Sequence, residues 1–156
     1  MANAPHPPYT PVVRAGDWII VSGQLGMKDG ALVPGGVAAQ TAQAVINLKA
    51  QLASMDATVN DIAKTLCFLK DMDTFATFNE QYAKGFGTAR PARSTIGVAS
   101  LPFGGAVEIE AWAYKPLTGG AKKSAKKAAK KSTAKKSTKK SVAKKTVKKS
   151  AKKKKK

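Results

Sequence analysis

The chain has few of the side chains on which many catalytic and structural sites depend. Its 156 residues include one cysteine, Cys67, and one histidine, His6. A single cysteine excludes an internal disulfide framework and a cysteine-rich metal site. With no second histidine, a zinc site or a Ser-His-Asp site lacks its parts. We therefore expect a site that holds no metal and uses no organic cofactor.

Long apolar runs and an N-terminal signal segment are also missing from the sequence. No apolar run approaches the roughly 20 residues that a helix needs to span a membrane. The proline-rich residues 1–8 are predicted to be extended, because proline is excluded from the interior of regular elements. We expect a cytoplasmic protein that does not bind a membrane.

Acidic residues are missing from the last part of the chain, and this explains the formal net charge of +19. Residues 1–120 contain nine basic and nine acidic side chains, whereas residues 121–156 contain nineteen lysines and no acid. Residues 118–120, Thr-Gly-Gly, are predicted to be a flexible hinge. The lysines that follow recur in doublets every four or five residues, without an apolar face or an aromatic residue. Residues 118–156 are therefore predicted to be a disordered basic tail.

The composition of this tail indicates binding to DNA or RNA through residues 121–156. Lysines that neutralise phosphates release bound counterions, and this release favours binding. It resembles the lysine-, alanine- and serine/threonine-rich C-terminal extensions of linker histones. Lysine contacts position a nucleic acid but do not select its sequence. A solubilising extension and an anchor to anionic membranes or polyphosphate are the alternatives, and association with the nucleoid is a further expectation. The predicted contacts are the doublet lysines Lys122, Lys123, Lys126, Lys127, Lys130, Lys131, Lys135, Lys136, Lys139, Lys140, Lys144, Lys145, Lys148 and Lys149.

The periodicity of the first 117 residues predicts one α+β domain. Apolar residues alternate in short segments that are typical of strands, and recur every three or four residues in two segments that are typical of helices. The second helix is predicted to have Asp73 as its N-cap. The expected order places strands at 12–14, 17–22, 62–70, 94–99 and 106–114, a short hairpin within 23–34, and helices at 37–54 and from 73 to about 86. Two helices packed on one face of a sheet satisfy this order.

Charged side chains mark the last two predicted strands, which are expected to share one sheet. Arg93 precedes the first of them, and Glu108 and Glu110 lie two residues apart in the second, hence on one face. Carboxylates in a short apolar strand are costly unless they are paired or exposed. A solvated sheet face and a functional site are both consistent with this pattern.

Four segments resemble the reactive intermediate deaminase (YjgF-type) family over about residues 8–115. They are Ser-Gly-Gln at 22–24, Phe-Ala-Thr-Phe-Asn-Glu-Gln-Tyr at 75–82, Pro-Ala-Arg-Ser-Thr at 91–95, and Leu-Pro-Phe-Gly-Gly-Ala-Val-Glu-Ile-Glu-Ala-Trp-Ala at 101–113. The resemblance implies a chorismate-mutase-like fold in residues 9–117 and a homotrimer with clefts between its subunits. It also implies hydrolysis of reactive 2-imino or enamine acids to 2-oxo acids and ammonia.

The resemblance assigns a role to each matching residue. Arg93 matches the arginine that binds the substrate carboxylate, and Glu108 matches the glutamate that handles the catalytic water. The residues that match the family's substrate-binding positions are Tyr9, Ser22, Asn79 and Thr95. Thr95 stands where many relatives have cysteine, and Phe103 replaces a common lysine, so substrate preference is the property most affected.

Two interpretations of function remain open. In the first, the domain is a 2-iminobutanoate/2-iminopropanoate deaminase-type hydrolase that carries a nucleic-acid-binding tail. In the second, the domain is a non-catalytic trimeric platform that presents basic tails to DNA or RNA. A ribonuclease ranks behind both, because no pair of histidines or cluster of carboxylates supports phosphodiester cleavage.

Overall fold

The computed structural model describes residues 8–117. Our expectations for residues 1–7 and for the basic tail, including its nineteen lysines, lie outside the described residues. Within the described part, no helix is long and apolar enough to cross a membrane.

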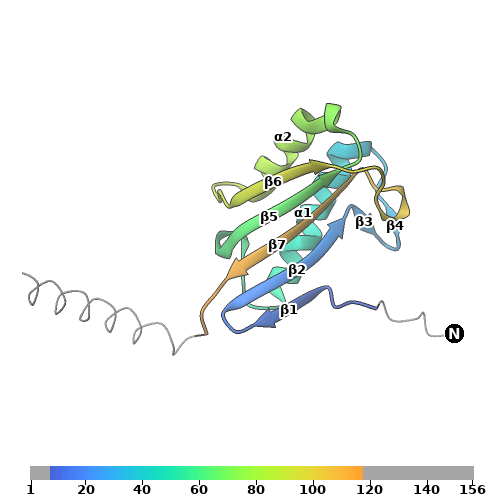
Figure 1. Ribbon diagram of the computed structural model, residues 1–156. Coiled ribbons are helices and arrows are strands. Elements are labelled where there is room, and N and C mark those ends of the chain that lie inside the picture. The colour runs from blue at the N-terminus through green and yellow to red at the C-terminus, as the bar shows by residue number, and fades with distance from the viewer. Residues whose placement is uncertain (1–7, 118–156) are drawn as a thin grey trace, which may run out of the picture. The chain divides into compact units, whose positions relative to one another are not determined.

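The described residues form a five-stranded sheet with two helices on one of its faces (Figure 1). The strand order is β1-β2-β7-β5-β6, and only β5 and β6 pair in parallel. The sheet strands are β1 (Val12–Ala15), β2 (Trp18–Leu25), β5 (Ile62–Leu69), β6 (Ala92–Gly97) and β7 (Val107–Tyr114). The helices are α1 (Gly36–Ala53) and α2 (Phe75–Phe86), and a small hairpin joins β3 (Met27–Lys28) to β4 (Ala31–Leu32). The predicted α+β architecture is confirmed.

Alternating residues of the central strand β7 form the floor of the core. Val107, Ile109, Ala111 and Ala113 are fully buried beneath the helices. From α1, Leu48 and Leu52 pack into the same core, and α2 contributes a row of three aromatic side chains, Phe78, Tyr82 and Phe86. Burying side chains of this size stabilises the fold by roughly 1.5–3 kcal/mol each. The period-two and period-3.6 patterns of the sequence therefore correspond to the two layers of the domain.

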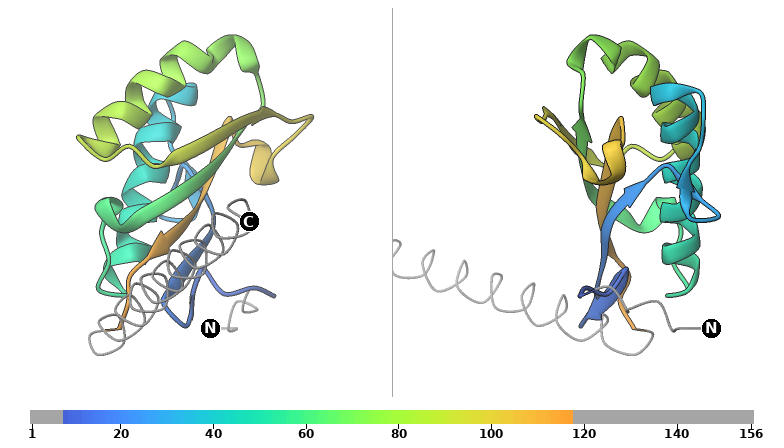
Figure 2. Two further views of the ribbon diagram at one scale, coloured as in Figure 1. Left: turned by 60° about the vertical axis from the view of Figure 1, so that its left-hand side comes forward. Right: turned by 90° about the vertical axis from the view of Figure 1, so that its right-hand side faces the viewer.

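The opposite face of the sheet is not covered by any described segment (Figure 2). It carries Trp112 and Tyr114 from β7, Leu66 and Phe68 from β5, and the two carboxylates Glu108 and Glu110. Trp18 of β2 meets Tyr114 edge-on, with ring centroids 5.2 Å apart. An apolar sheet face of this extent is unusual on a soluble monomer and indicates an interaction surface.

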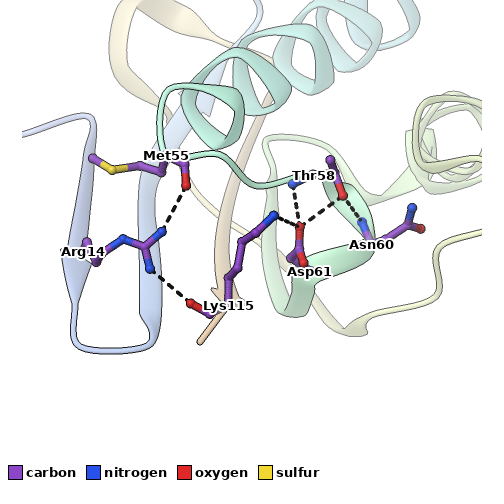
Figure 3. A network of polar contacts seen from close by, with 6 residues as sticks. All are labelled: Arg14, Met55, Thr58, Asn60, Asp61 and Lys115. Atoms are coloured by element: carbon purple, nitrogen blue, oxygen red, sulfur yellow. Dashed lines mark hydrogen bonds and ion pairs between the residues drawn. The ribbon is translucent and has the colours of Figure 1, made fainter. Parts of the chain in front are cut away.

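Polar contacts fasten the end of the sheet to the loop after α1 (Figure 3). The Arg14 guanidinium donates to the carbonyl oxygens of Met55 and Lys115, at 3.0 and 3.1 Å. Lys115 in turn pairs with Asp61, 3.4 Å away, whose carboxylate also accepts from the backbone N–H of Thr58. These contacts join β1, the end of β7 and the start of β5.

The structure confirms one detail of the sequence-based fold and corrects another. The last two predicted strands share one sheet, in which β5 lies between β6 and β7. Asp73 does not cap the second helix. The carboxylate of Asp71 accepts instead from the N–H of Asp73, at the start of a 3₁₀ turn over Met72–Thr74. α2 follows directly from that turn, so its first residue needs no separate side-chain cap.

Candidate active site

Arg93 lies on the helix side of β6, against the aromatic face of α2. Its guanidinium carbon is 4.7 Å from the ring centroid of Tyr82, 5.5 Å from that of Phe78 and 5.7 Å from that of Phe75. The electron-rich faces of aromatic rings attract a guanidinium and restrict its orientation. The three- to four-residue spacing of these aromatic residues predicts a helix but does not reveal which strand they face.

Asn79 of α2 is in direct contact with Arg93. Arg93 Nη2 donates a hydrogen bond of 2.8 Å to Asn79 Oδ1. Behind them, the hydroxyl groups of Thr65 and Tyr82 share a buried hydrogen bond of 2.8 Å. The arginine is therefore held by one amide and by aromatic rings that are themselves fixed, which suits it to bind an anion in a defined orientation.

A groove of about 420 Å³ opens beside Arg93. This volume falls in the range of about 300–1,000 Å³ that is common for small-ligand sites. Its walls combine the aromatic side chains of α2 with polar groups from the segment between α2 and β6. The lining residues are Asn79, Tyr82, Ala83, Phe86, Ala89, Arg90, Pro91 and Arg93.

Thr95, two residues after Arg93 on the same face of β6, is half-buried beside Cys67. Its Oγ1 is buried without a hydrogen-bond partner among the described residues. Cys67 is fully buried, and burial raises the pKa of its thiol to about 11, so it remains protonated at neutral pH. Cys67 is therefore a small residue of the hydrophobic core.

Glu108 lies on the other face of the sheet. It is half-buried, and its pKa is raised from the ordinary value, first by burial and then by the neighbouring charge of Glu110. Burial alone raises the pKa of Glu110. A glutamate with a raised pKa exchanges protons more readily near neutral pH than an ordinary one, which suits a general acid or base.

The carboxylate of Glu108 rests against the backbone of Gly23. A methyl group at that glycine would come within 1.7 Å of Glu108 Oε1. This close approach occurs where the pairing of β2 with β7 shifts register between Val21 and Gln24, as at a β-bulge. The sequence pattern Ser-Gly-Gln marks the bulge, but its steric role cannot be recognised without the position of Glu108.

Ser22 and Tyr9 lie near the first strands rather than near Arg93. Ser22 Oγ donates to the carbonyl oxygen of Thr10 at 2.8 Å, and its N–H donates to the carbonyl oxygen of Pro11 at 2.9 Å. Tyr9, which directly precedes Thr10, is 61 % exposed. Ser22 therefore holds the segment that carries Tyr9 and directly precedes the glycine beneath Glu108.

One chain does not bring Arg93 and Glu108 together. On β5, Arg93 is in register with Thr65, and Glu108 is in register with Phe68. Because Thr65 and Phe68 are three residues apart, their side chains point to opposite faces of the sheet. The predicted site residues thus form two clusters, one around Arg93 and Asn79 and one around Glu108. Within residues 8–117, no three His, Cys, Asp or Glu side chains are grouped as metal ligands would be.

Comparison with known proteins places this geometry in a family. Residues 1–115 match the family described as endoribonuclease L-PSP, and the chain belongs to this family. It is 42 % identical over 117 residues to a RutC family protein of Pyrococcus horikoshii, covering 72 % of this chain and 93 % of that protein. It is 42 % identical over 114 residues to a 2-iminobutanoate/2-iminopropanoate deaminase of Bos taurus, covering 71 % and 83 %.

Solved structures agree with the fold. The crystal structure of TdcF from E. coli with bound serine superposes with a TM-score of 0.67 at 34 % identity, covering 71 % of this chain and 91 % of that one. The YjgF-type α+β fold is therefore confirmed. The names of the family, its relatives and the solved structures include endoribonuclease, RutC family protein and imine deaminase, so the names alone do not select the reaction.

The contact between Gly23 and Glu108 can be tested with Gly23→Ala. Gly23 has no positive φ, so alanine fits the backbone, and the flexible carboxylate is expected to move into solvent. Less burial lowers the pKa of Glu108 toward 4.5. The pKa of Glu110, which is raised by its own burial, is expected to change less. Titration of both carboxyl carbons by NMR measures the two values. An unchanged pKa of Glu108 would show that the glycine does not position it.

Proposed function

We propose that the domain is a hydrolytic deaminase of 2-imino and enamine acids, with an active site completed between subunits. The observation that carries the proposal is the separation of Arg93 and Glu108 on opposite faces of one sheet. Each has the chemistry that imine hydrolysis needs, and a second copy of the chain can supply the missing half. The deaminase names of mammalian relatives support the same reaction.

A homotrimer is the assembly that we propose. The uncovered sheet face exposes 43 % of Trp18, 45 % of Ile96 and 47 % of Tyr114, an apolar surface that a neighbouring subunit would bury. Packing that face against the next subunit brings Glu108 toward the edge formed by β6 and α2 of another copy. The resemblance to YjgF-type proteins supports three as the number of subunits.

Each proposed residue takes one part of the reaction. The Arg93 fork binds the substrate carboxylate bidentately, and the Thr95 N–H lies beside it. Glu108 of another subunit accepts a proton from a water molecule while the water oxygen bonds to the imine carbon. The proton passes to the imine nitrogen and gives a carbinolamine. Its hydroxyl proton then passes through Glu108 to the same nitrogen as the carbon–nitrogen bond breaks, so that ammonia and a 2-oxo acid leave. Asn79, Ser22 and Tyr9 orient the substrate and the water.

Replacement of Arg93 tests the enzyme directly. Because the guanidinium holds the reacting carbon in place, Arg93→Ala is expected to lower kcat/KM by at least about a hundredfold. Arg93→Lys, which keeps the charge but loses the planar fork, is expected to retain an intermediate rate. The measurement is the release of ammonia from 2-iminobutyrate that is generated in the assay. The control variant is Lys49→Ala, which changes an exposed residue of α1. Wild-type turnover in Arg93→Ala would favour the non-catalytic platform instead.

Mixed assemblies test the placement of the site between subunits. Arg93→Ala and Glu108→Gln chains are each expected to be inactive alone, but co-expression at equal levels leaves both intact side chains in about a quarter of the sites between subunits. Activity is therefore expected to return to about a quarter of the wild-type rate per site. Mixing after separate folding, without subunit exchange, is the control. No recovery on co-expression would place both residues in one subunit's site.

The tail supports a second, additional function, non-specific binding to nucleic acid. The observation that favours this function is the composition of residues 121–156, which contain nineteen lysines and no acidic residue. A trimer would present three such tails, and simultaneous contacts would strengthen weak individual ones. Association with the nucleoid rests on this same property.

Salt-dependent binding tests the tail. The full chain is expected to bind a labelled DNA duplex with a log–log salt slope of about −0.9 per phosphate contact. Replacement of the fourteen doublet lysines by glutamine should abolish most of this binding, whereas Lys49→Gln should not change it. Fluorescence anisotropy at several salt concentrations measures both effects. Equal binding by the glutamine-substituted chain would exclude the tail as the contact.

A further inference from the structure

A second arginine, Arg90, lines the groove beside Arg93. Only Ala92 and Pro91 separate the two residues, so their Cα atoms lie at most about 10 Å apart. Pro91 fixes its own φ and forms part of the groove wall. Both guanidinium groups can therefore reach one small ligand in this groove.

Neither arginine has an acidic partner in the part of the chain that the structure describes. The two ion pairs found there join Lys84 to Glu80 and Lys115 to Asp61. Arg93 contacts a neutral amide and aromatic rings instead, and Arg90 contacts backbone carbonyl groups. The groove thus contains two positive charges that no described carboxylate neutralises.

Arg90 is held so that one edge of its guanidinium stays available. Its Nη1 donates to the carbonyl oxygens of Gly87 and Ala89, at 2.6 and 2.8 Å. The remaining donors, on Nε and Nη2, form the side-on fork that binds a carboxylate bidentately. The two backbone contacts fix the side chain before a ligand arrives and reduce the entropy lost on binding.

We propose that this groove selects dicarboxylic substrates, with one carboxylate on Arg93 and a second, at the end of the side chain, on Arg90. Tyr82 and Phe86, whose stacked rings lie 4.0 Å apart between centroids, line the groove where the intervening methylene groups would pass. The inference rests on the proposed function for the imino group itself. It adds a class of substrate, the 2-imino dicarboxylic acids derived from acidic amino acids.

Two stable product analogues of equal length test the second carboxylate. 2-Oxoglutarate has two carboxylates, and 2-oxopentanoate has one on the same five-carbon chain. Titration calorimetry on the full wild-type chain is expected to show about tenfold tighter binding of 2-oxoglutarate. In Arg90→Gln, the ratio of the two affinities is expected to fall from about tenfold to about twofold. This loss of about fivefold is the effect expected from removing one exposed charge pair.

The basic tail could also attract a dianion, so each variant is compared in the full chain. Lys49→Gln removes one positive charge from exposed α1 and is expected to keep the wild-type ratio. Arg90→Lys keeps the charge without the fork and is expected to give an intermediate ratio; it carries the test if Arg90→Gln does not fold. A wild-type ratio in Arg90→Gln, or in Arg90→Lys if that variant carries the test, would overturn the proposal. So would equal affinities in the wild type.

Failure of this inference is distinguishable from failure of the proposed deaminase. Binding of the 2-oxo acids is measured without turnover, whereas deamination is measured with monocarboxylic 2-iminobutyrate and depends on Arg93. Arg93-dependent turnover together with no preference for 2-oxoglutarate would contradict only the proposed contact between Arg90 and a second carboxylate, and would leave the deaminase proposal intact. A preference for 2-oxoglutarate without turnover would support a dicarboxylate-binding groove and would contradict the proposed deaminase activity.

Discussion

The alternation of side chains along β5 is the constraint on which the candidate site depends. Because β5 is hydrogen-bonded to β6 on one side and to β7 on the other, its register determines the faces on which Arg93 and Glu108 lie. Thr65 and Phe68 are an odd number of residues apart, so the two charged groups must point in opposite directions. No rotamer change in one chain can bring them together, and chemistry that uses both requires another subunit.

The same constraint places two carboxylates on an apolar surface. Glu108 and Glu110 share the uncovered sheet face with tryptophan and tyrosine side chains, and their raised pKa values reflect that environment. Covering the face by another subunit would remove more water and shift both pKa values further in the same direction. In the assembly that we propose, completion of the site and the further rise in the pKa of Glu108 would be one event, because the same interface would cause both.

The sequence predicts the parts of this structure that local periodicity determines. The alternation in β7 and the three- to four-residue spacing in both helices identify the core correctly, including Cys67. The insertion of β5 between β6 and β7 is not predictable in this way, since strand order depends on contacts distant in sequence. The stacking of Arg93 on α2 and the approach of Gly23 to Glu108 follow from that order. The resemblance to a known family singled out Arg93 and Asn79 as candidate site residues, and the structure shows that they are hydrogen-bonded to each other.

The two uses of positive charge that we propose for this chain differ in their physical chemistry. The tail carries nineteen lysines at regular intervals, so its attraction depends on number and is weakened steeply by salt. Arg90 and Arg93 act through fixed geometry: backbone carbonyls hold one, and an amide with aromatic rings holds the other. A bidentate contact in a partly enclosed groove is less sensitive to salt than many separate lysine–phosphate contacts. Raising the ionic strength should therefore release a bound polyanion while a small dicarboxylate stays in the groove.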